Sequence, residues 1–189
     1  PTPQWFDHSI DRYWQWPKKR SSDWLERGFF NSLALDGGQA LELTCGDGFY
    51  TSYFYAGKLG KIIACDRNPR AIGHALRRNK AENIDFVVAD ILHGMPSGEF
   101  SNVIWDFGFP WSDYFTTEQI NSVVVQIRSR LKVNGIFSGY LAVHSAAKTP
   151  SVQEYAREIS FANIDEIHQF LLKFFANVRV IETMSATRH

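Results

Sequence analysis

The sequence predicts a single α/β domain in which a mostly parallel sheet has helices on both faces. From Gln39 onward, short apolar runs are each followed by a turn and a helical stretch, the pattern of a parallel sheet built by crossover helices. The length of 189 residues suits one hydrophobic core. We expect one domain over 1–189, with a helical N-terminal cap over 1–36 and the sheet-containing core over 39–189.

Six apolar runs are the predicted strands. They cover residues 40–43, 61–65, 85–89, 102–105, 135–143 and 178–183. Two of the intervening helices have clear start signals. Asn68 followed by Pro69 is a favourable N-cap and first-turn pair, and Thr116 with Gln119 forms a capping box. The alternation of strand and helix is therefore encoded locally.

Composition excludes several classes of protein. Apolar residues make up 44% and charged residues 21%, and no apolar stretch approaches the roughly 18 residues that span a bilayer. Twenty basic residues balance twenty acidic ones, so the broad positive field that binds nucleic acid is missing. Cys45 and Cys65 and the six histidines show no metal-ligand spacing. We expect a cytoplasmic protein without a signal sequence, metal, membrane or nucleic-acid partner.

The first predicted strand runs into a turn with two glycines, Gly46 and Gly48, within the segment LELTCGDGFY over 41–50. Glycine lets a ligand approach the backbone closely. Ligands of open parallel sheets bind beyond the carboxyl ends of the strands. The turn is therefore a candidate ligand site, although a plain tight turn has the same pattern.

Acidic residues follow the next three strands. Asp66 lies 20 residues after Gly46 (66 − 46), where a carboxylate can accept both hydrogen bonds of a ribose diol. A turn or N-cap acid is the alternative. Asp90 could accept from an adenine amine, with Ile91 covering the base, and Asp106 ends the fourth strand. With Glu42, these like charges favour a donor-rich or cationic ligand.

This ordered set of segments resembles the class I S-adenosylmethionine-dependent methyltransferases. The segments are 41–48, 63–66, 88–91, 103–106 and 131–136, so the resemblance covers about 40–143. It implies a Rossmann-like three-layer sandwich whose seventh and last strand is antiparallel. It also implies S-adenosyl-L-methionine as cofactor, with S-adenosyl-L-homocysteine as product.

The resemblance implies that the glycine turn underlies the methionine part of the cofactor, that Asp66 binds the ribose and that Asp90 binds the adenine. The candidate cofactor-binding residues are Glu42, Thr44, Cys45, Gly46, Gly48, Asp66, Arg67, Asp90, Ile91, Trp105 and Asp106. Thr44 stands where the family has its first turn glycine. Because a β-branched residue avoids the left-handed region, we expect an extended backbone there.

Methyl transfer requires alignment of acceptor and methyl group, plus removal of a proton where the acceptor is a hydroxyl. The loop after the fourth strand holds Asp113 and Tyr114, the nearest equivalents of the acid and histidine found there in small-molecule members. His144 could act as a base or be structural. The candidate catalytic residues are Asp106, Asp113, Tyr114 and His144.

The sequence thus predicts a methyltransferase acting on an oxygen or nitrogen of a small molecule or sugar. The aromatic N-terminal segment resembles the helical cover of the acceptor site in small-molecule members, although packing against the sheet would explain it equally. A nicotinamide oxidoreductase fits less well, because the turn reads Gly46-x-Gly48-x-x-Thr51. A binding module that keeps the cofactor pocket without catalysis is the third possibility.

Overall fold

The computed structural model describes residues 22–106, 116–140, 161 and 163–182. The chain divides into two compact units. The first comprises Pro1–Asp106 and Arg130–Tyr140, and the second comprises Phe107–Ser129 and Leu141–His189. The whole sheet belongs to the first unit.

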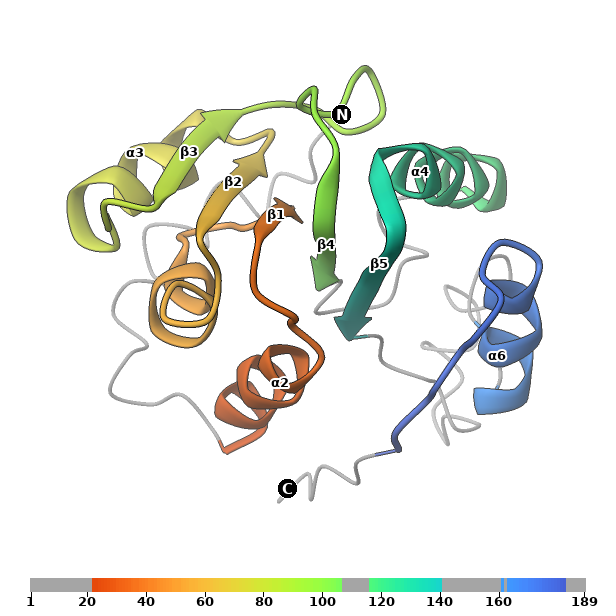
Figure 1. The fold of residues 1–189 in the computed structure, drawn as a ribbon. Helices are drawn as coiled ribbons and strands as arrows, with labels where there is room; N and C mark the ends of the chain where they lie inside the picture. The colour runs from red at the N-terminus through yellow and green to blue at the C-terminus, as the bar shows by residue number, and fades with distance from the viewer. Residues whose placement is uncertain (1–21, 107–115, 141–160, 162, 183–189) are drawn as a thin grey trace, which may run out of the picture. The chain divides into compact units, whose positions relative to one another are not determined.

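Five parallel strands form the sheet in the order β3-β2-β1-β4-β5 (Figure 1). Their bounds are β1 Gln39–Leu43, β2 Lys61–Asp66, β3 Ile84–Val88, β4 Phe100–Asp106 and β5 Leu131–Tyr140. The order reverses at β1, so the carboxyl ends of β1 and its neighbours β2 and β4 flank the switch point where ligands of open α/β sheets bind. The predicted parallel α/β fold is confirmed.

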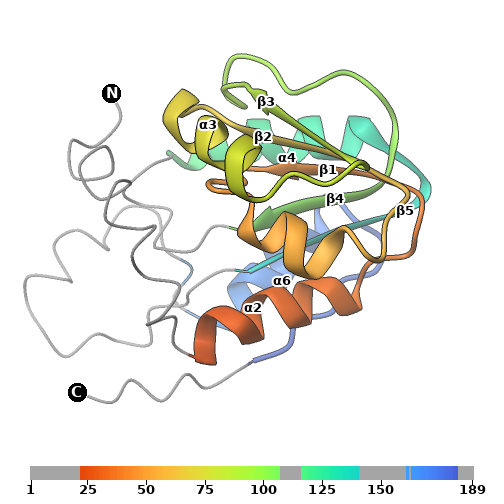
Figure 2. The ribbon, with the colours of Figure 1, turned by 90° about the vertical axis from the view of Figure 1, so that its left-hand side faces the viewer.

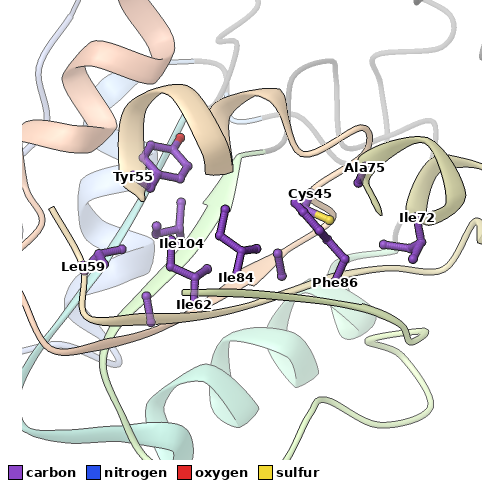
Figure 3. Packing of buried hydrophobic residues seen from close by; sticks show 11 residues of the cluster. Cys45, Tyr55, Leu59, Ile62, Ile72, Ala75, Ile84, Phe86 and Ile104 are labelled. Carbon is purple, nitrogen blue, oxygen red and sulfur yellow. The ribbon is translucent and has the colours of Figure 1, made fainter. Parts of the chain in front are cut away.

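Both faces of the sheet are buried, as expected for parallel strands with near-continuous apolar runs. On one face, Tyr55 and Leu59 pack over Ile62 and Ile104 (Figure 3). The other members of this cluster are Ala40, Cys45, Ala64, Ile72, Ala75, Ile84 and Phe86. Residues that alternate with these along the strands are also buried, namely Leu41, Leu43, Cys65, Val103 and Trp105. This two-sided burial agrees with the three-layer prediction.

Three helical segments accompany the sheet in the first unit: α2 Ser22–Leu33, the π-helical η2 Thr51–Tyr55 and α3 Pro69–Arg78. The segments η2 and α3 cover the same face, and α2 lies beside η2 (Figure 2). The Asn68 side chain accepts a hydrogen bond from the backbone amide of Arg70 at 2.9 Å, which confirms the predicted N-cap of α3.

The second unit contains α4 Thr117–Arg130, apart from its last residue, and α6 Ile164–Leu172. The capping box of α4 is formed as predicted. The amide of Thr116 donates to the Gln119 side chain at 2.8 Å, and the amide of Gln119 donates to the Thr116 hydroxyl at 3.3 Å. No helix in the described part of the chain has the length and apolarity to cross a bilayer.

Two strand predictions were wrong in detail. The strand β5 begins at Leu131 rather than at residue 135, because an irregularity between Leu131 and Ile136, with Asn134 at φ 61°, still leaves Leu131 paired to β4. Residues 178–182 form no strand. Their β-branched pattern favours extended backbone, but a strand also needs a partner, and no described residue pairs with them. Neither a sixth nor an antiparallel strand occurs among the described residues.

The fully buried Asn102 of β4 forms hydrogen bonds with the loop that precedes β1. Its side-chain amide donates to the Gly37 carbonyl at 2.7 Å, and its carbonyl accepts from the Asp36 amide at 3.1 Å. We expect Asn102→Ala to lower the free energy of unfolding by about 1 to 3 kcal/mol, because these backbone groups lose their partners. Urea unfolding should show this loss, while Ser101→Ala should change stability by no more than about 0.5 kcal/mol. Equal effects would contradict this role.

Candidate cofactor-binding site

The turn between β1 and η2 is the centre of the candidate site. Three of its residues have left-handed backbone, Thr44 at φ 54°, Gly46 at φ 56° and Gly48 at φ 70°. The expectation of an extended backbone at Thr44 was therefore wrong. The Thr44 hydroxyl donates to the Leu43 carbonyl at 2.7 Å and lies 3.5 Å from the Asp106 carbonyl. These local contacts accompany a conformation that β-branched residues normally avoid.

The two glycines are needed for different reasons. A Cβ atom on Gly48 would clash with the Phe86 ring, so this glycine permits packing inside the protein. A Cβ atom on Gly46 would meet nothing within 4 Å. The open side of the turn is therefore at Gly46, where a ligand can approach the backbone.

Asp66 joins the turn to the end of β2. One carboxylate oxygen accepts from the Gly46 amide at 3.0 Å and the other accepts from the Asn68 amide at 2.8 Å. Burial raises the pKa of Asp66, and these two hydrogen bonds and the charge of Arg67 oppose the rise. An ionised carboxylate has about four acceptor positions, so two remain for a ligand such as a diol.

Glu42 is buried on β1, with 2% of its surface exposed. Burial raises the pKa of Glu42 to about 8, the neighbouring Thr51 side chain opposes this rise, and nearby acids add to it. Those acids are Asp106, Asp47 and Asp66. Glu42 therefore holds its proton at neutral pH, which removes one negative charge from the carboxyl edge of the sheet.

Arg27 of α2 is a site residue that the sequence analysis missed. Its guanidinium donates to the Asp106 carboxylate at the end of β4 and forms an ion pair with it. The guanidinium also lies 4.6 Å from the ring centre of Tyr140 and 5.7 Å from that of Tyr50, within the range of cation–π attraction. A surplus of acids at one edge was the available signal, because a buried ionised acid is commonly stabilised by a cation from elsewhere in the chain.

The residues that follow β3 form a turn in which Asp90 contacts its sequence neighbours. One oxygen of Asp90 accepts from the Leu92 amide at 3.0 Å, and the other lies 3.1 Å from Nδ1 of the exposed His93. Ile91 is buried, with 4% of its surface exposed. The roles of Asp90 and Ile91 in binding adenine stay predictions.

The other candidates differ in accessibility. Cys45 and Trp105 are buried, and Trp105 is fully so and lies in β4 between β1 and β5. Their roles in binding the cofactor stay predictions. Burial raises the pKa of the Cys45 thiol, and it raises the pKa of the Cys65 thiol to about 12. Neither cysteine is therefore a reactive thiolate. The candidates Asp113, Tyr114 and His144 lie outside the described residues.

We expect Thr44→Gly to raise the free energy of unfolding by about 0.5 to 1 kcal/mol. Relief of a left-handed residue contributes roughly 1 to 2 kcal/mol, and the greater chain entropy of glycine offsets part of it. The matched variant Thr44→Ala keeps a Cβ atom and should be less stable than the glycine variant. Thermal and urea unfolding of the two variants check this. A glycine variant less stable than the alanine variant would contradict it.

Replacing Glu42 by Gln should flatten the pH dependence of stability. A carboxyl whose pKa rises from 4.5 to about 8 on folding stabilises the native state fully below its unfolded pKa, and this contribution is lost as the pH rises toward 8. Each pH unit in this window changes the free energy of unfolding by at most about 1.4 kcal/mol. Urea unfolding at several pH values should show the decline in wild-type protein and in the exposed control Glu82→Gln. The same decline in Glu42→Gln would disprove the assignment.

Several solved structures resemble this fold. No curated protein matches the chain in sequence. A complex of DhpI with SAH shares 17% identity at a TM-score of 0.64, covering 89% of this chain and 84% of DhpI. In a complex of DhpI with SAM and HEP the chain covers only 61% of the DhpI chain.

Two further solved structures have the same fold at low identity. The N-methyltransferase NodS from Bradyrhizobium japonicum WM9 shares 20% identity at a TM-score of 0.54, covering 68% of this chain and 76% of NodS. The amino pentose methyltransferase CalS10 from Micromonospora echinaspora shares 14% identity at a TM-score of 0.55, covering 71% of this chain and 57% of CalS10. At such identities these similarities establish the fold alone.

The family described as methyltransferase domain matches residues 40–135. This range holds β2 to β4, all but the first residue of β1, and the glycine turn. It also holds the acids Glu42, Asp66, Asp90 and Asp106. The match covers just over half of the chain and confirms the resemblance, with S-adenosylmethionine as the cofactor that goes with the family. The sheet topology and the similar solved structures confirm the Rossmann-like fold. The chain therefore belongs to the methyltransferase domain family.

Proposed function

We propose that this protein transfers a methyl group from S-adenosylmethionine to an oxygen or nitrogen of a small molecule or sugar. The observation that carries the proposal is the open glycine turn at Gly46, flanked by the acids Asp66 and Asp106 at the switch point of the sheet. NodS and CalS10, whose folds are similar, are described as an N-methyltransferase and an amino pentose methyltransferase. These descriptions support small acceptors.

The residues present fit this cofactor. S-adenosylmethionine offers donors, namely an ammonium, a ribose diol and an adenine amine, and the carboxyl edge of the sheet offers acceptors. Asp66 would hold the diol with its two remaining acceptor positions, and Asp90 at the end of β3 would receive the adenine amine. Gly46 leaves space for the methionine part. When bound, the cofactor supplies an electrophilic methyl group.

We propose that the acceptor binds at the loop after β4. Asp106 begins this loop, and its ion pair with Arg27 fixes the carboxylate and ties it to α2. This contact supports the proposal that the N-terminal cap over 1–36 helps to exclude water from the reacting centre. Asp113, Tyr114 and His144 remain proposed catalytic groups, of which a base is needed only where the acceptor must lose a proton.

Family membership argues against the nicotinamide oxidoreductase. A module that binds the cofactor without catalysis is the second alternative, because a fold does not by itself establish catalysis. Calorimetric titration with S-adenosylmethionine, S-adenosylhomocysteine and NADH distinguishes a methyltransferase from a nicotinamide oxidoreductase. We expect micromolar binding of the two adenosyl compounds and none of NADH, and binding of NADH alone would overturn the proposal.

Turnover separates an enzyme from a binding module. Release of S-adenosylhomocysteine should be measured with a panel of amino sugars, small amines and polyols, each beside its N-acetylated or O-methylated counterpart. Turnover that is lost with the N-acetylated or O-methylated counterpart would show whether the enzyme methylates a nitrogen or an oxygen. Tight cofactor binding with no turnover across the panel would favour the binding module.

We expect Asp66→Asn to weaken binding of S-adenosylhomocysteine by about 1 to 3 kcal/mol, because an amide offers only one acceptor oxygen to the Gly46 and Asn68 amides and to the diol. The matched control is Asp85→Asn on β3, where the carboxylate is 56% exposed and pairs with Lys61 at 2.7 Å. Calorimetry should show the loss in the first variant only, with unfolding curves to confirm that both are folded. Unchanged affinity in Asp66→Asn would remove the ribose assignment.

A further inference from the structure

Thr44 is conspicuous in the glycine turn because glycine would adopt the same backbone without strain. At φ 54° a residue with a Cβ atom costs roughly 1 to 2 kcal/mol relative to its usual conformations. Such residues gather at ligand sites, where the strain accompanies a function. A threonine in this place therefore directs attention to a contact that glycine could not make.

The sheet order places Thr44 relative to the other acceptors. The strands run β3, β2, β1, β4 (Figure 1), and the residues at or just after their carboxyl ends are Asp90, Asp66, Thr44 and Asp106 in the same order. Neighbouring strands lie about 4.8 Å apart. A ligand with its adenine at Asp90 and its ribose at Asp66 therefore has its amino-acid end at Thr44 and Asp106.

The Thr44 hydroxyl has the chemistry that this end of the ligand needs. A hydroxyl has one proton and two lone pairs, and the proton is donated to the Leu43 carbonyl at 2.7 Å. The side chain is partly exposed, so its lone pairs are available to a donor. An ammonium group carries three N–H donors and no acceptor.

We propose that the Thr44 hydroxyl accepts a hydrogen bond from the ammonium of the cofactor's amino-acid end and so determines specificity for that end. The proposal rests on the proposed function, because it takes the ribose and adenine assignments as its frame. The competing explanation is structural. In that case the hydroxyl only links the turn to the end of β4, where it lies 3.5 Å from the Asp106 carbonyl.

The test compares two ligands that differ in the amino-acid part. S-adenosylhomocysteine carries it, whereas 5′-methylthioadenosine keeps adenine, ribose and sulfur but lacks it. Thr44→Val removes the hydroxyl and retains the branched shape, and Thr44→Ser retains the hydroxyl. Thr44→Ala provides the same loss of hydroxyl with a smaller side chain if the valine variant is poorly folded. Affinities are measured by calorimetry on proteins whose folding is checked by thermal unfolding.

We expect the valine variant to bind S-adenosylhomocysteine about tenfold more weakly, since a hydrogen bond to a charged group is lost. Binding of 5′-methylthioadenosine should stay within about twofold, and Thr44→Ser should behave as wild type. An equal loss for both ligands would show that Thr44 only shapes the turn and would overturn the proposal. No loss for either ligand would overturn it too. Wild-type protein that binds neither ligand would remove the proposed function itself.

Discussion

The rest of the site depends on one constraint, which is that several carboxyl groups lie together at one edge of a buried parallel sheet. Each is compensated in its own way within the described part of the chain. Glu42 keeps its proton, Asp66 accepts two backbone amides, and Asp106 pairs with a guanidinium. Without this compensation the mutual repulsion and the loss of hydration would oppose folding.

The cation that neutralises Asp106 comes from a helix outside the strand-turn-helix repeats. Arg27 belongs to α2, and its side chain reaches the ends of β4 and β5, where it contacts Asp106 and Tyr140. The position of α2 is thereby coupled to the edge on which a ligand would bind. A helix held by an ion pair and a cation–π contact has a defined place beside the site, which a purely apolar contact would specify less sharply.

The sequence was informative wherever the signal is local. Strand and helix periodicity, the Asn68 cap and the Thr116 capping box all depend on neighbouring residues, and the structure bears them out. Other features have no such local signal. Gly48 is needed because it packs against Phe86, 38 positions away, and Arg27 pairs with Asp106, 79 positions away. The left-handed backbone of Thr44 is a strain within the turn. No periodic pattern encodes such contacts. The strand predicted over 178–183 failed because β-propensity cannot supply a pairing partner.

The protein itself neutralises some of the acids at the carboxyl edge of the sheet, and this changes which ligands the edge can bind. Four acids near the carboxyl ends of four strands favour a cationic ligand when they are counted in the sequence. Yet Glu42 is neutral at pH 7 and Asp106 is paired with Arg27. The edge therefore offers a ligand chiefly the acceptor lone pairs of Asp66, Asp90 and the turn, and less negative charge than the number of acids suggests. Recognition of this kind depends on donors in the right positions, such as a diol and two amines. It follows that the adenosine and amino-acid parts, which the cofactor and its product share, would dominate binding, with the single charge on sulfur contributing less.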